Sequence, residues 1–134
     1  MERSSRYFQA GPEAPREARE FVSGMLAPTS ANGAADVAVL LTSELMADAV
    51  RNGDGRISID MQLAAGGMRI EVSNLEPALV PMTPAGSLER RFAVALVDAM
   101  SSSWGSEGDR DRTSAWFELP FAPAEVEVPV LAGV

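Results

Sequence analysis

Residues 34–52, AADVAVLLTSELMADAVRN, decide the fold class of this 134-residue chain. The stretch is rich in strong helix formers, and its apolar side chains recur at the three- and four-residue spacing of an amphipathic helix. Gly53 follows at the position where glycine commonly ends a helix. A central helix is therefore predicted, with one apolar stripe facing the core. The expected stripe comprises Val37, Leu40, Leu41, Leu45 and Ala49.

A β-hairpin is expected directly after this helix. Residues 56–63 (RISIDMQL) and 68–73 (MRIEVS) alternate apolar and polar side chains on either side of a short Ala- and Gly-containing connection. One face of each strand is apolar, which predicts a sheet with one buried side. Further strands are predicted at residues 4–10, from Trp104, and at 113–119.

Two more helices flank these strands. Pro15 suits the first turn of a helix that Pro28 ends, and Ser87 can cap another that runs to Ser101. Residues 75–86 carry three prolines and no periodicity, so a loop is expected there. The predicted buried stripe of the last helix comprises Leu88, Phe92, Ala95, Leu96 and Ala99.

The order of these elements predicts an α/β fold. A two-layer sandwich is expected, with a mixed or antiparallel sheet and helices on one face. The length suits one domain, which we place at residues 4–120, and residues 121–134 are expected to form a peripheral or disordered tail.

Composition excludes several kinds of chemistry. Without cysteine or histidine the sequence cannot form disulfides, zinc–thiolate sites or Ser-His-Asp triads, so any catalysis must use carboxylates, hydroxyls, arginine or a bound metal. A net charge of -8 disfavours direct nucleic-acid binding and favours a basic or neutral protein partner. No apolar run approaches the roughly 20 residues of a membrane helix, and the N-terminus lacks a secretory pattern. We expect a cytoplasmic protein that contacts no membrane.

The candidate chemistry lies at the end of the central helix. Glu44 and Asp48 are four residues apart, so they share one helix face, and Arg51 lies three residues further along that face. One interpretation is a solvated helix face with an Asp48–Arg51 ion pair. The other is a site in which Glu44 orients or deprotonates a hydroxyl while Asp48 binds magnesium through oxygen.

A family resemblance bears on this choice. ELMADAVRN (residues 44–52) resembles the ELVTNAVRH motif of actinobacterial anti-sigma-factor kinases, which belong to the gyrase/histidine-kinase (GHKL) superfamily. EVSN (71–74), WG (104–105) and WFEL (116–119) follow in the order seen in that family, and the opening FQAGPEAPREAREFV is also similar. The similarity covers about residues 7–119. It implies a histidine-kinase-like ATPase domain with the Bergerat-type fold.

The resemblance also implies roles for individual residues. Glu44 keeps the position of the base that activates a serine hydroxyl on a partner protein, and Asp48 replaces the asparagine that binds magnesium. The same motif places Arg51 and Asn52 among the ATP-binding positions. Asn74 replaces the aspartate that accepts a hydrogen bond from adenine, although asparagine is equally common as a turn residue that ends a strand. If Asp48 is a magnesium ligand, replacing it with alanine is expected to leave the stability of the apo protein unchanged.

The second glycine motif of the family is absent. Arg91 and Ala93 align with glycines that let phosphate approach the N-terminus of the third helix, so their Cβ atoms are expected to narrow that approach. Arg90 and Arg91 could bind phosphate through their side chains, or form a basic first turn on an exposed face.

Three interpretations follow. The favoured one is a binding module for a sigma factor or an anti-sigma antagonist, with weakened or lost ATP binding, because three nucleotide-binding elements are altered. The second is an active ATP- and Mg-dependent serine kinase that phosphorylates the antagonist. The third is an unrelated α/β sandwich with a structural or small-ligand role. Relatives often form dimers, so a homodimer is one expected assembly.

Overall fold

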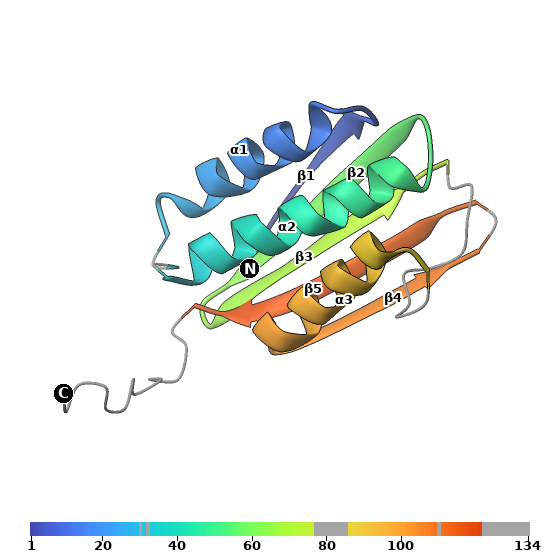
Figure 1. Ribbon diagram of the computed structural model, residues 1–134. Helices are drawn as coiled ribbons and strands as arrows, with labels where there is room; N and C mark the ends of the chain where they lie inside the picture. The colour runs from blue at the N-terminus through green and yellow to red at the C-terminus, as the bar shows by residue number, and fades with distance from the viewer. Residues whose placement is uncertain (30, 32, 77–85, 110, 122–134) are drawn as a thin grey trace.

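The computed structural model describes residues 1–29, 31, 33–76, 86–109 and 111–121. Strands and helices follow one another in the predicted order (Figure 1). The elements are β1 (Glu2–Gln9), α1 (Ala14–Leu26), α2 (Gly33–Arg51), β2 (Arg56–Ala64), β3 (Gly67–Asn74), α3 (Leu88–Met100), β4 (Ser103–Gly108) and β5 (Thr113–Pro120).

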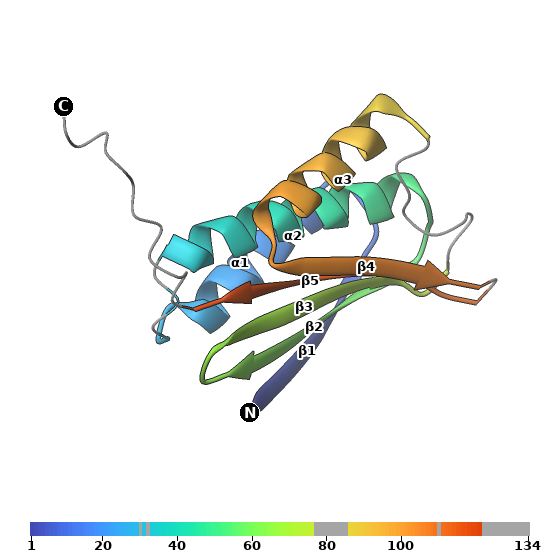
Figure 2. The ribbon, with the colours of Figure 1, turned by 90° about the horizontal axis from the view of Figure 1, so that it is seen from below.

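One sheet and one layer of helices make up the domain. The five described strands lie in the order β1-β2-β3-β5-β4, and every neighbouring pair is antiparallel. The three described helices cover the same face of this sheet, as the view in Figure 2 shows. The predicted two-layer α/β sandwich is thus confirmed, and the sheet is antiparallel rather than mixed.

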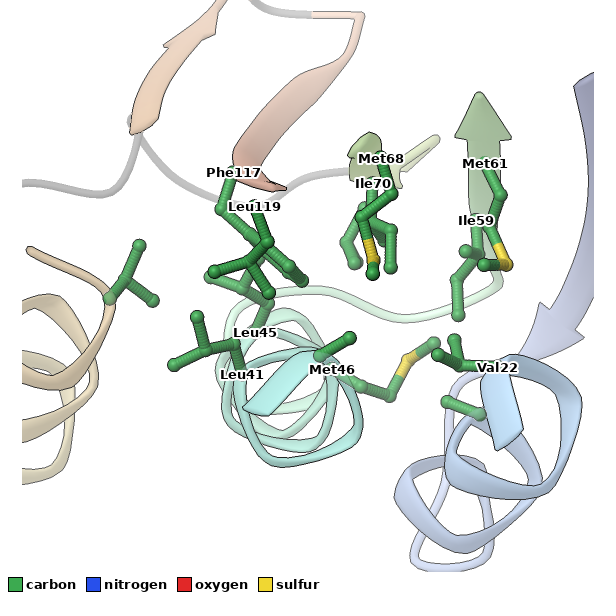
Figure 3. Packing of buried hydrophobic residues seen from close by; sticks show 14 of the residues in the cluster. Val22, Leu41, Leu45, Met46, Ile59, Met61, Met68, Ile70, Phe117 and Leu119 are labelled. Atoms are coloured by element: carbon green, nitrogen blue, oxygen red, sulfur yellow. The ribbon is translucent and has the colours of Figure 1, made fainter. Parts of the chain in front are cut away.

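The core lies between the described helices and one face of the sheet, and α2 and the hairpin that follows it contribute many of its residues. β2 and β3 pair with Ile59 opposite Val72 and Met61 opposite Ile70, so the predicted apolar faces meet on the helix side of the sheet. Figure 3 shows Leu45 of α2 below Phe117 and Leu119 of β5, while Met46 extends toward Val22 of α1. The predicted burial of the hairpin's apolar face is confirmed.

The predicted stripe of α2 is wrong at Leu40. This side chain is 38% exposed, whereas Leu41 is 0% exposed. Successive helical residues are about 100° apart, so an arc centred on Leu41 and Leu45 continues to Thr42 and Met46 and excludes Leu40.

The predicted stripe of α3 is wrong for most of its members. Leu88 is 70% exposed and Phe92 is 58% exposed, Ala95 and Ala99 are also exposed, and Leu96 is half-buried. α3 carries two apolar stripes, and only one of them can face the sheet. The buried stripe comprises Arg90, Ala93, Val94 and Val97.

The ends of two elements refine the expected boundaries. Ser87 caps α3 as predicted, since its hydroxyl accepts a hydrogen bond from the N–H of Arg90 at 3.2 Å. Phe121 is 9% exposed and its N–H donates to the carbonyl of Gly66 at 3.1 Å, so the core extends one residue past the predicted boundary. Most of the expected loop at 75–86 and of the expected tail lies outside the described residues.

Candidate functional site

Asp48 lies at the centre of the candidate site, and it pairs with an arginine of α3. Nε of Arg90 donates to Oδ1 of Asp48 at 3.1 Å, and Nη2 donates to Oδ2 at 3.0 Å. Both side chains are buried, with 8% of Asp48 and 10% of Arg90 exposed. The predicted contact with Arg51 is present at a longer distance, 3.6 Å to Oδ1. The interpretation of Asp48 as part of a solvated helix face is therefore wrong.

The position of Arg90 differs from the sequence-based expectation. The sequence predicts an exposed or phosphate-binding first turn, but Arg90 lies on the inner stripe of α3 with Val94 and Val97. These residues follow Arg90 by four and seven positions, which is the spacing of one helix face. That spacing was the available signal. The decisive partner, Asp48, is 42 residues away in sequence.

Asn74 has a structural role at the end of β3. Its Nδ2 donates to the carbonyl of Ala49 at 3.0 Å, and its Oδ1 accepts from the N–H of Glu76 at 3.2 Å. The side chain is buried against Gly53, where a Cβ would lie 2.1 Å from Nδ2. Both polar atoms that could recognise adenine are thus used to close the end of α2 and the turn after β3. This geometry agrees with the interpretation of Asn74 as a turn residue.

Asn52 and Arg51 complete the end of α2. Nδ2 of Asn52 donates to the carbonyl of Asp48 at 2.7 Å, which satisfies one of the last carbonyls of the helix. The side chain of Arg51 is 36% exposed. Asn52 therefore serves the helix terminus, while Arg51 remains accessible at the edge of the site.

A small cavity lies beside these residues. Its volume is about 30 Å³, and its lining comes from α2, β3, α3 and β5 and includes Asp48, Asn74, Arg90 and Thr113. A cavity of this size has room for a water molecule or two. It is far too small for a nucleotide.

Arg91 and Ala93 do not lie where the family alignment places them. α3 begins at Leu88, so these residues are the fourth and sixth of the helix and not at its start. Arg91 is exposed, and its N–H already donates to the carbonyl of Ser87 at 3.0 Å. Ala93 is 0% exposed and faces the core. A Cβ at either position therefore does not obstruct free amides at the helix terminus.

The start of α3 has a carboxylate of its own. The Glu89 carboxylate accepts a hydrogen bond from its own backbone N–H and another from the Ser87 hydroxyl. These two bonds, the first being the larger cause, and the nearby charge of Arg51 lower the pKa of Glu89 from its ordinary value. A helix N-terminus attracts anions. Here an ionised side chain of the protein lies at that terminus.

Glu44 differs from the other candidates because no described residue contacts its carboxylate through a hydrogen bond or ion pair. It is half-buried on α2, one helical turn before Asp48, and it forms no hydrogen bond or ion pair with any residue that the structure describes. Because Asp48 faces α3, the shared face places Glu44 on the α3 side of α2 as well.

The described residues do not fit a magnesium-bound nucleotide. Both carboxylate oxygens of Asp48 accept from Arg90, so the carboxylate can bind a metal only if that guanidinium moves away. The structure thus gathers Asp48, Arg90, Asn52 and Asn74 around a water-sized cavity, with Glu44 one turn away. Among the described helices, none has the length and hydropathy needed to cross a membrane.

Comparison with known proteins adds no family assignment. A scan of the sequence against models of known protein families gives no match, and a search of curated proteins gives none either.

Proposed function

We propose that the protein is a regulatory binding module of the anti-sigma type, which binds a sigma factor or an anti-sigma antagonist and does not require ATP. The observation that carries this proposal is the buried pair between Asp48 and Arg90. Asp48 aligns with the asparagine that binds magnesium in the family that the chain resembles, and here its carboxylate is paired with Arg90.

The strength of this pair opposes metal binding. A bidentate arginine–carboxylate contact is among the strongest side-chain hydrogen bonds. Magnesium at Asp48 would have to displace the Arg90 guanidinium from both carboxylate oxygens. Binding of Mg–ATP through Asp48 is therefore expected to be weaker than at a carboxylate without such a partner.

The position expected to bind adenine, Asn74, supports the same proposal. Asn74 uses both polar side-chain atoms in bonds to the backbone, and the adjoining cavity of about 30 Å³ holds no base. Binding adenine would require these bonds to break and the cavity to open.

The charge of the chain supports a protein partner. A net charge of -8 repels nucleic acid and attracts a basic surface, such as the DNA-binding surface of a sigma factor.

Calorimetric titration with ATP, with and without magnesium, tests the first half of the proposal. We expect no binding at millimolar ATP in either condition. Magnesium-dependent binding at micromolar ATP would show that the Asp48–Arg90 pair opens readily and would overturn this half. Titration with each purified sigma factor and antagonist of the same organism tests the second half. One of them should bind equally well with and without ATP, and the absence of any binding would contradict the proposal.

An active serine kinase is the second candidate, and it is favoured by the Glu44 carboxylate, which has no hydrogen-bond or ion-pair partner among the described residues. In that candidate Glu44 accepts the proton of a partner's serine hydroxyl. Transfer of labelled phosphate to an antagonist by the parent would support it, provided that Glu44→Gln abolishes turnover while nucleotide affinity stays unchanged.

A further inference from the structure

Exposed apolar side chains are concentrated on the outer side of α3. Leu88 is 70% exposed, Phe92 58% and Met100 38%, and Leu96 between them is half-buried. These four residues recur every four positions, so they form one continuous ridge along the helix. We call them the α3 ridge. An aromatic side chain more than half exposed at the middle of such a ridge is typical of the centre of a protein interface.

The exposed apolar surface continues onto α2. The pair between Asp48, near the end of α2, and Arg90, near the start of α3, fixes the two helices side by side in opposite directions (Figure 1). Leu40 lies eight residues before Asp48, about 12 Å back along α2, which brings it level with the last turns of α3. Leu40 is 38% exposed.

Carboxylates lie beside this apolar surface. Glu44 lies on the α3 side of α2, one turn from Leu40, and forms no ion pair with a described residue. Glu89 lies at the first turn of α3, and its lowered pKa keeps it ionised at neutral pH. Arg91, the exposed arginine of α3 within the described residues, repels a basic group that approaches the start of that helix. Attraction for a basic group is therefore expected mainly at Glu44.

We infer that the α3 ridge, together with Leu40 and Glu44, is a docking surface for a basic amphipathic helix of a partner protein. The apolar residues of that helix, spaced by three and four positions, pack against the ridge, and a lysine or arginine beside them pairs with Glu44. Two copies of this chain, each with a net charge of -8, repel one another, so a second copy is disfavoured as the occupant. The inference rests on the proposed function, because it names the kind of segment that the binding module takes.

Peptide titration followed by backbone NMR tests this surface. The probe is a synthetic helix of about 18 residues made of leucine, lysine and alanine, long enough to be helical in isolation. The comparison peptide has glutamate in place of each lysine. The lysine peptide should bind the parent and shift the amide signals of α3 and of α2 near Leu40. Phe92→Ser and Leu88→Ser should each weaken binding about tenfold, and Glu44→Gln should weaken it severalfold.

Tyr7→Ser is the matched control, because Tyr7 is 62% exposed on β1 and lies outside the ridge. This variant should bind the lysine peptide as the parent does. Equal loss in Tyr7→Ser, unchanged binding in both ridge variants, or equal affinity for the glutamate peptide would overturn the inference. Self-association of the parent that Phe92→Ser abolishes, measured by sedimentation, would overturn it in favour of a second copy. None of these outcomes alters the ATP titration, so the two proposals fail separately.

Discussion

Arg90 of α3 clamps both carboxylate oxygens of Asp48 on α2, at 3.1 and 3.0 Å. The pair joins the last turn of one helix to the first turn of another, and it is buried against the sheet. It therefore fixes the rotation of α3 about its own axis. With Arg90 turned inward, Phe92 necessarily faces solvent.

Asp48→Ala should destabilise the protein. The substitution removes the carboxylate that neutralises the buried guanidinium of Arg90, so we expect a loss of about 3–5 kcal/mol in the free energy of unfolding, measured by urea denaturation. This reverses the sequence-based expectation that removing a metal ligand leaves the apo protein unchanged.

Two further variants test whether the loss of stability in Asp48→Ala comes from the broken pair with Arg90 or from any substitution in this region. Arg51→Ala removes a half-exposed contact at 3.6 Å and should cost less than about 1 kcal/mol. Asp48→Leu combined with Arg90→Met should recover most of the lost stability, because apolar residues can replace a buried ion pair without large cost. Strictly additive losses in the double variant would mean that the two side chains are not coupled.

The neighbours Leu40 and Leu41 should respond differently to truncation. Leu41→Ala and Leu45→Ala each create a cavity under the sheet and should cost about 2–5 kcal/mol. Leu40→Ala removes an exposed side chain and should change the free energy of unfolding by no more than about 0.5 kcal/mol. Thermal or urea denaturation of the three variants distinguishes this placement of α2 from one in which Leu40 faces the core.

The rotation of α3 has its own test. Val97 is 0% exposed, so Val97→Ala should cost about 2 kcal/mol through lost burial. Phe92→Ala should leave the melting temperature close to that of the parent, although phenylalanine is the larger side chain. A large loss in Phe92→Ala and none in Val97→Ala would restore the buried stripe that the sequence predicts.

The sheet and the central helix could be predicted because their patterns are local. Alternation over residues 56–63 and 68–73 places one whole face of the hairpin on the core, and the structure extends the strands to Arg56–Ala64 and Gly67–Asn74. A one-residue error in register would have put polar side chains under the helices. α2 likewise begins at Gly33 and ends at Arg51, within a residue of the predicted bounds.

The site could be predicted only as far as its location. Spacing and resemblance identified Asp48 and Asn74, but not what each side chain contacts. Asp48 meets a residue 42 positions away, and Asn74 reaches back 25 positions to Ala49. On α3 both stripes contain apolar residues, and counting Arg90 as a surface residue selected the wrong one. Contacts across such separations depend on tertiary packing, which no local pattern specifies.

Glu89 gives the protein a specific dependence on acid. The N–H of Glu89, the Ser87 hydroxyl and the charge of Arg51 lower the pKa of this carboxyl from its ordinary value of 4.5 in the folded state. A group whose pKa is lower in the folded state stabilises the protein above the unfolded pKa, and the contribution disappears as the pH falls through the folded pKa. The parent should therefore be more stable than Glu89→Gln at neutral pH, and the difference should shrink as the pH falls below about 4.5 and vanish in stronger acid. Melting temperatures of both proteins from neutral pH into this range measure the effect.

The control for a general loss of charge is Glu17→Gln, which removes the acidic side chain in the first turn of α1. A difference between parent and Glu89→Gln that grows as the pH falls would mean that Glu89 destabilises the start of α3.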